Sequence, residues 1–163
     1  MAFSLRVFVL LCGISGLLTG AWSWSLTKDK DTCCPKGWTQ LDDHCYIFLD
    51  ENRTFADSER ICNTIGGNLV SITDDLENFV VYELAVVGGA SQAWIGLYDA
   101  FEDGVYFWID GTDFDFENFA MPKSGNDTCV VIQTNGGSGE WVGESCDAGN
   151  PFVCISDANC NKH

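Results

Sequence analysis

The sequence predicts a disulfide-linked α+β domain, and three observations support this fold class. Two segments with helical periodicity come first, at residues 54–65 and 73–87. Short apolar and aromatic runs follow, separated by glycine, aspartate and asparagine, as in antiparallel strands joined by turns. Nine cysteines in 163 residues supply the covalent links, and this length suits one domain rather than two.

The first helix begins with a capping signal. Thr54 is a good N-cap, and Asp57 lies three residues later, as in a capping box. Gly66-Gly67 ends the helix, because glycine accepts the left-handed conformation found after helix C-termini. One face of the helix is formed by Phe55, Ser58, Ile61, Cys62 and Ile65.

The second helix is expected to start at Thr73 and to stop at Gly88-Gly89. Asp74 and Asp75 suit the positive end of the helix dipole. Four apolar residues repeat at helical spacing, namely Leu76, Phe79, Val80 and Leu84.

Five strands are expected beyond the helices, at residues 93–97, 105–109, 129–132, 140–142 and 152–155. The stretch from Tyr98 to Asp127 is too irregular for continuous secondary structure, and a loop of this length in a compact domain is usually functional. Within it, the alternation of acidic and aromatic residues over 110–117 fits either a half-buried strand or a ligand surface with exposed aromatics.

The N-terminus has the pattern of a secretory signal peptide over residues 1–21. Arg6 precedes an apolar run at residues 7–18, and Thr19 and Ala21 are small residues before a cleavage point. The run of about a dozen residues is shorter than the roughly 20 that a membrane span needs. We therefore expect a secreted, extracellular protein without membrane insertion, with an N-terminal lead at 22–33, a domain at 34–156 and a tail at 157–163.

Cysteine usage and charge narrow the function further. Removal of Cys12 with the signal peptide leaves eight cysteines, which predict four disulfides in a secreted domain. The chain contains no CxxC pair of the kind that binds zinc, so a zinc site is not expected.

The net charge is −16, from 24 acidic and 8 basic residues, so nucleic acid is excluded as a partner. Asn52 and Asn126 begin N-glycosylation sequons and should lie at the surface.

Six segments in order resemble the C-type lectin-like domain family, in the long form of secreted single-domain fish lectins. Glu77 and Phe79 fit the second helix of that family. The other segments are Cys34-Pro35-Lys36-Gly37-Trp38 with Cys45, Gly66-Gly67-Asn68-Leu69-Val70-Ser71-Ile72, Trp94-Ile95-Gly96-Leu97, Trp108-Ile109-Asp110-Gly111-Thr112 and Phe152-Val153-Cys154. The resemblance implies a lectin-like fold with two helices on antiparallel sheets and a long irregular loop.

The resemblance also implies a disulfide pairing. By analogy with the family, the bonds join Cys34 to Cys45, Cys62 to Cys154, and Cys129 to Cys146. Cys33 and Cys160 remain. The two ends of this fold lie close together, so we expect an intrachain bond between them. The alternative is an interchain bridge in a homodimer.

Sugar-binding members of the family hold calcium in the long loop through carboxylate and amide oxygens. At the corresponding positions this chain has Met121, Lys123, Val142 and Gly143, which supply no carboxylate or amide side chain. Asp127 keeps ligand chemistry, and Glu144 or Asp115 could compensate only after rearrangement. We therefore expect a degenerate calcium and sugar site, with ligand contacts sought among Met121, Lys123, Asp127, Val142, Gly143 and Glu144. Trp94, Trp108 and Trp141 are expected to pack in the core.

A binding protein is favoured over an enzyme. The only histidines are His44 and His163, and the cysteines are expected in disulfides, so no nucleophile and base pair can be assembled. The resemblance implies a glycan or glycoprotein ligand, in an innate defence role. The alternatives are calcium-independent recognition of a protein, ice binding, and an acidic matrix role.

Overall fold

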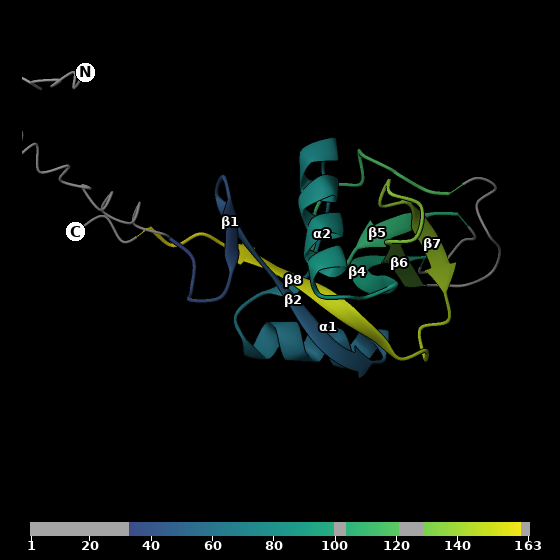
Figure 1. Ribbon diagram of the computed structural model, residues 1–163, viewed down its shortest axis with the longest axis horizontal. Coiled ribbons are helices and arrows are strands. Elements are labelled where there is room, and N and C mark those ends of the chain that lie inside the picture. The colour runs from purple at the N-terminus through teal and green to yellow at the C-terminus, as the bar shows by residue number, and fades with distance from the viewer. Residues whose placement is uncertain (1–32, 100–103, 121–128, 161–163) are drawn as a thin grey trace, which may run out of the picture. The chain divides into compact units, whose positions relative to one another are not determined.

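The computed structural model describes residues 33–99, 104–120 and 129–160, which belong to one compact unit (Figure 1). The signal peptide and the candidate residues Met121, Lys123, Asn126 and Asp127 lie outside the described residues. The elements are β1 (Thr39–Leu41), β2 (His44–Arg53), α1 (Phe55–Thr64), β3 (Asn68–Leu69), α2 (Asp75–Val87), β4 (Gln92–Asp99), β5 (Tyr106–Trp108), β6 (Cys129–Gln133), β7 (Trp141–Glu144) and β8 (Asn150–Asp157).

The sheet has the order β1-β2-β8-β4-β6-β7, with β3 added to β8 and β5 added to β4. The α+β class is confirmed, but the sheet is mixed rather than wholly antiparallel. β4 and β8 run parallel where Trp94 is paired with Phe152. Parallel neighbours need a long connection, and here β5, β6 and β7 intervene between the two strands. The last strand thereby enters the middle of the sheet, and residue 157 belongs to it.

Helix α1 forms as its capping signal predicts. Thr54 is the N-cap, and its side-chain oxygen accepts a 3.2 Å hydrogen bond from the Asp57 backbone N–H. Phe55, Ser58 and Cys62 are buried. Ile65 is 42% exposed because it follows the last helical turn, so it does not belong to the buried face.

Helix α2 starts close to the expected Thr73, with Asp74 as its N-cap accepting a 2.8 Å hydrogen bond from the Glu77 N–H. Its buried face is not the one that the apolar repeat indicates. The buried residues are Glu77, Asn78, Val81 and Ala85, whereas Leu76 and Phe79 are 53% and 56% exposed. Glu77 and Asn78 can face inward because both have hydrogen-bond partners in the sheet and its loops.

The sheet has a separate apolar core on each face. Successive residues of a strand point to opposite faces, so Trp94 packs in the cluster that contains Phe55 of α1, while Ile95 packs in the cluster that contains Val81 of α2. Figure 1 shows α1 and α2 separated by the long strands β2 and β8. The central strands are buried on both faces, which explains their nearly continuous apolar sequences.

Four disulfides link the chain: the three pairs that the resemblance implies and the intrachain bond between the two remaining cysteines. They join Cys33 to Cys160, Cys34 to Cys45, Cys62 to Cys154 and Cys129 to Cys146. The Cα atoms of Cys33 and Cys160 are 4.4 Å apart, and the bond lies within the chain. In this arrangement neither Cys33 nor Cys160 has a thiol for the alternative interchain bridge.

Candidate functional site

The candidate site lies at the β6–β7 end of the sheet. Strand β7 pairs with β6 so that Gly143 lies opposite Val130 and Val142 opposite Val131. The segment before residue 121 also contacts β7, because the Ala120 N–H donates to the Trp141 carbonyl at 3.0 Å. The described residues on both sides of 121–128 therefore adjoin β7.

The two central residues of β7 cannot coordinate a cation through their side chains. Val142 is half-buried and packs against the α1-side core, and Gly143 has no side chain. Coordination of calcium requires six to eight oxygens, mostly from carboxylates and carbonyls. The structure therefore places apolar chemistry at these two candidate positions.

Glu144 ends β7, and its carboxylate already has protein partners. Oε1 accepts a 2.9 Å hydrogen bond from the Ser145 N–H, and Oε2 lies 3.4 Å from Nε2 of Gln92. Gln92 in turn donates to Oδ1 of Asn150 at 2.8 Å. Glu144 thus belongs to a polar network at the end of the sheet. Among the described residues, no three His, Cys, Asp or Glu side chains are grouped so as to hold a metal ion.

The tryptophans pack in the core, as expected. Trp94 and Trp141 are fully buried and Trp108 is 2% exposed. The Trp141 ring meets those of Trp108 and Phe116 edge-on, at centroid distances of 5.5 and 5.7 Å, and its Nε1–H donates to Oδ1 of Asn78 at 2.8 Å. These rings are therefore not available as open stacking platforms for a sugar.

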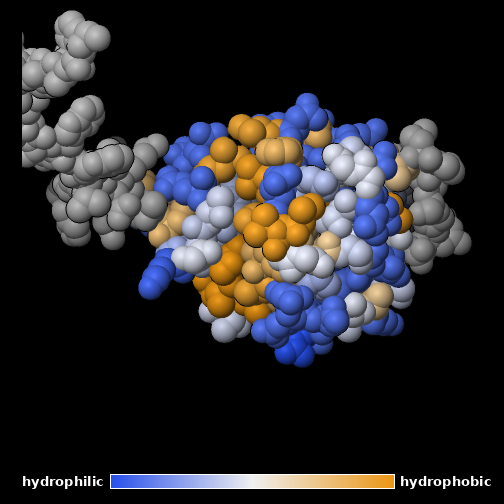
Figure 2. Space-filling view, in the orientation of Figure 1, coloured by the Kyte–Doolittle hydropathy of each residue, from blue (hydrophilic) through white to orange (hydrophobic). Residues whose placement is uncertain are grey.

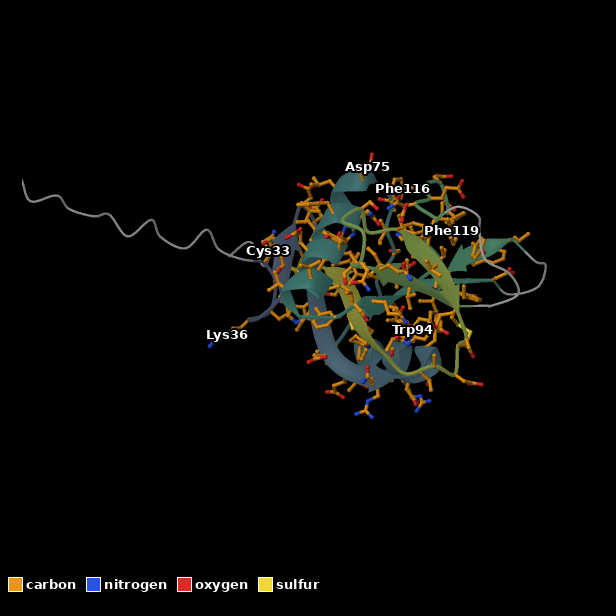
Figure 3. The ribbon with its side chains drawn as sticks, turned by 45° about the vertical axis from the view of Figure 1, so that its right-hand side comes forward. Cys33, Lys36, Asp75, Trp94, Phe116 and Phe119 are labelled. Atoms are coloured by element: carbon orange, nitrogen blue, oxygen red, sulfur yellow. A yellow bond between two sulfur atoms is a disulfide. The ribbon has the colours of Figure 1, made fainter. Side chains whose placement is uncertain are left out.

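The acidic and aromatic stretch at 110–117 has a solvated face and a packed face, without forming a regular strand. Asp113, Asp115 and Glu117 are exposed, whereas Phe114 and Phe116 are half-buried against the α2-side core. Figure 3 shows Phe116 and Phe119 on the α2 side of the sheet, away from Trp94. Of the two alternatives for this stretch, the half-buried one is confirmed in its alternating burial, but the stretch is not a strand.

The sequence patterns did not indicate a polar pocket of about 360 Å³. It lies between the start of β2, the turn from α1 to β3, the start of α2, the end of β8 and the segment that follows β5. Glu77 lies at its wall. Its Oε1 accepts from the Tyr46 hydroxyl at 2.9 Å, and its Oε2 accepts from the N–H and hydroxyl of Thr73 at 2.6 and 2.8 Å. His44 is at the same wall, with Nδ1 3.7 Å from Oε1.

Burial, together with the neighbouring Glu77 carboxylate, raises the pKa of the Tyr46 phenol above its usual range. The phenol therefore remains a hydrogen-bond donor to Glu77. The sequence contained part of the signal, since Asp74 and Glu77 have the spacing of a capping box. The pairing with Tyr46 could not be found this way, because the two residues are 31 positions apart.

Asn52 lies exposed at the end of β2, where a glycan could be attached. In the described part of the chain, no helix is both long enough and apolar enough to cross a bilayer.

The comparisons agree with this fold. The chain belongs to the C-type lectin domain family, whose model, described as "Lectin C-type domain", matches residues 51–156. Ladderlectin of Oncorhynchus mykiss is 33% identical over 73% of this chain, and the match spans only 64% of ladderlectin. The galactose-specific lectin nattectin of Thalassophryne nattereri is 30% identical over 82% of this chain and 86% of its own length. The crystal structure of a calcium-independent type II antifreeze protein superposes with a TM-score of 0.71 and 26% identity, over 77% of this chain and 95% of that one.

Proposed function

We propose that this protein is a secreted, non-enzymatic lectin-like module that binds a glycan or glycoprotein without using calcium in the manner of its sugar-binding relatives. The observation that carries the proposal is the chemistry of β7. Val142 packs into the core and Gly143 has no side chain, so the strand contributes no side-chain oxygen where a calcium ligand pair is expected.

Nattectin, a family member of 30% identity, is a galactose-specific lectin, which supports a glycan ligand for this chain. The proposal includes secretion through the signal peptide at 1–21 and N-glycosylation at Asn52 and Asn126. It also places the ligand contacts at the β6–β7 end, with Met121, Lys123 and Asp127 contributed by the adjoining loop.

Ice binding is the second candidate, since a calcium-independent antifreeze protein has this fold. Ice-binding surfaces in this class of fold would have to be flat and apolar or rich in threonine. The high acidity of the chain, with 24 acidic residues, favours a hydrated surface instead. A measurement of thermal hysteresis separates this candidate from the glycan-binding one.

The test is a calcium titration of the chelator-treated protein by calorimetry, compared with two variants. Asp127→Ala removes the remaining carboxylate of the family pattern. A graft of Met121→Glu, Lys123→Asn, Val142→Asn and Gly143→Asp restores the ligand types that the family uses. We expect no binding below millimolar calcium for the parent and for Asp127→Ala, and a gain of binding in the graft.

A glycan array probed with and without a chelator completes the test. Binding that is equal in both conditions supports the proposal. Micromolar calcium binding by the parent that disappears in Asp127→Ala would show that the site is intact and that the proposal is wrong. Retention of the near-ultraviolet circular dichroism of the parent shows that the graft is folded.

A further inference from the structure

Helix α2 presents an apolar stripe to solvent. Because the inward face is occupied by Glu77, Asn78, Val81 and Ala85, other apolar residues of the helix are left outside. Leu76 is 53%, Phe79 56% and Val87 84% exposed. With the half-buried Val80 they follow the helical spacing of i, i+3, i+4 and i+11. Figure 2 shows hydrophobic residues over this upright helix, with hydrophilic residues among them.

The stripe is bordered by negative charge. Asp74 and Asp75 are exposed at the helix N-terminus, and Glu83 lies half-buried on the next turns. In the described part of the chain, the Lys and Arg residues are Lys36, Arg53 and Arg60, none of which is on α2. Arg53 and Arg60 already form ion pairs with Glu51 and Asp57 on β2 and α1. The surface of α2 therefore combines apolar side chains with carboxylates that have no cation on the same helix.

A small pocket of about 250 Å³ adjoins the N-terminal half of the stripe. It is lined by Asp75, Phe79 and Tyr82 on one side and by Asn118 and Ser138 on the other. The Asn118 side chain donates to the carbonyls of Ser138 and Gly139 at 3.1 and 2.9 Å, so the far wall is fixed in place. A carboxylate beside two aromatic rings is the combination that receives the head of a lysine or arginine side chain.

We propose that α2 is the docking surface for a cationic amphipathic helix of a partner protein. The apolar face of that helix would cover Leu76, Phe79, Val80 and Val87, in the manner of helix-to-helix packing. One basic side chain would enter the pocket beside Asp75. Charge decides the occupant: two copies of this chain carry −16 each and would bring like charges together, whereas a basic helix complements the carboxylates.

This proposal is independent of the calcium-free glycan site, since none of the β7 residues Val142, Gly143 and Glu144 belongs to the stripe. The experiment measures fluorescence anisotropy of a labelled amphipathic helical peptide of leucine and lysine, titrated with the full mature protein. Two control peptides have the same length. One replaces every lysine with glutamate, and the other has the same composition in an order without an apolar face.

We expect the cationic amphipathic peptide to bind with an affinity that falls as the salt concentration is raised. Both control peptides should bind at least tenfold more weakly. Phe79→Ser combined with Val87→Ser should lower the affinity at least tenfold, and Asp75→Asn should lower it and reduce its salt dependence. Phe107→Ser is the matched control, because Phe107 on β5 is 44% exposed and lies outside the stripe.

Equal binding of the cationic peptide by the parent and the stripe variants would overturn the proposal. So would equal affinity of the parent for the cationic peptide and for the control peptide without an apolar face. Sedimentation of the protein alone provides a further outcome. Concentration-dependent dimerisation that disappears in Val87→Ser would assign the stripe to a second copy of this chain and would also overturn the proposal.

Discussion

The hydroxyl of Tyr46 donates a 2.9 Å hydrogen bond to Oε1 of Glu77, which joins β2 to the first turn of α2. Glu77 also accepts two hydrogen bonds from Thr73, immediately before the helix. One buried carboxylate therefore fixes both the start of α2 and its position on the sheet. This relationship determines which face of α2 remains outside.

Replacing the two partners should have unequal effects. Glu77→Ala leaves the buried Tyr46 hydroxyl and the Thr73 N–H without an acceptor, and we expect a loss of about 2–3 kcal/mol in the free energy of unfolding. Tyr46→Phe removes one hydrogen bond and leaves Glu77 with its Thr73 donors, so we expect a loss of about 1 kcal/mol. Urea unfolding of the oxidised proteins measures both. Equal losses would show that the Thr73 bonds contribute little.

Stability should fall in alkali through Tyr46. Its pKa is raised in the folded state by burial and by Glu77, whereas in the unfolded chain the phenol titrates near its usual pKa of about 10. The contribution is complete below about pH 10, and it is lost as the pH rises above that value because only the unfolded state releases the proton readily. Urea midpoints between pH 8 and 11.5 should drop less for Tyr46→Phe than for the parent.

Removing the Cys33–Cys160 bond should destabilise the domain without unfolding it at room temperature. The bond closes a loop with a sequence separation of 127, so the double variant Cys33→Ser and Cys160→Ser should lose about 3–5 kcal/mol in the chain-entropy account. The parent should run as a monomer on a non-reducing gel, and Cys33→Ser alone should give disulfide dimers through Cys160. A dimeric parent band that disappears on reduction would contradict the intrachain bond.

Gly96 in β4 should not tolerate a methyl group. A Cβ atom there would lie 2.7 Å from the Leu69 carbonyl oxygen and 3.1 Å from Cγ2 of Ile109, so Gly96→Ala should cost about 1–3 kcal/mol. Gly149→Ala is the control, since its nearest contact would be the Asn52 Cβ at 3.6 Å, and we expect a change within about 0.5 kcal/mol. Thermal unfolding of the three proteins compares them. Similar midpoints for all three would mean that β3 moves away from β4 easily.

Local signals were sufficient for much of the fold. The Thr54 cap, the glycines after α1 and the apolar runs of β4, β6 and β8 predict these elements because their determinants lie within a few residues of one another. The start of α2 belongs to the same class, although it was expected at Thr73 and the N-cap is the next residue, Asp74. The residue pattern alone did not predict strand β2, since its last residues, 50–53, are polar and exposed and have no alternating pattern.

The orientation of α2 required information from distant residues. Leu76 and Phe79 suggest an inward face by their hydrophobicity, but Glu77 and Asn78 are held inside by Tyr46, Trp141 and the Gly139 carbonyl. The three hydrogen bonds to the buried Glu77 carboxylate can outweigh the free energy that would be gained by burying Leu76 and Phe79 instead. The long-range partner in these bonds cannot be identified from local spacing. For the candidate site, the lack of ligand oxygens at Val142 and Gly143 could be predicted from the sequence. The contact of Glu144 with Gln92 could not, because it depends on how the sheet places β4 and β7 on either side of β6.

The Cys33–Cys160 bond also changes how the domain responds to cleavage. With Cα atoms only 4.4 Å apart, the two cysteines close the chain between them into a covalent ring. A protease that cuts one peptide bond anywhere inside this ring opens it but releases no fragment, and the hydrogen-bonded sheet can keep the new ends in register. The same closure should permit circularly permuted chains, in which Cys33 and Cys160 are joined by a short linker and new termini are opened in an exposed turn.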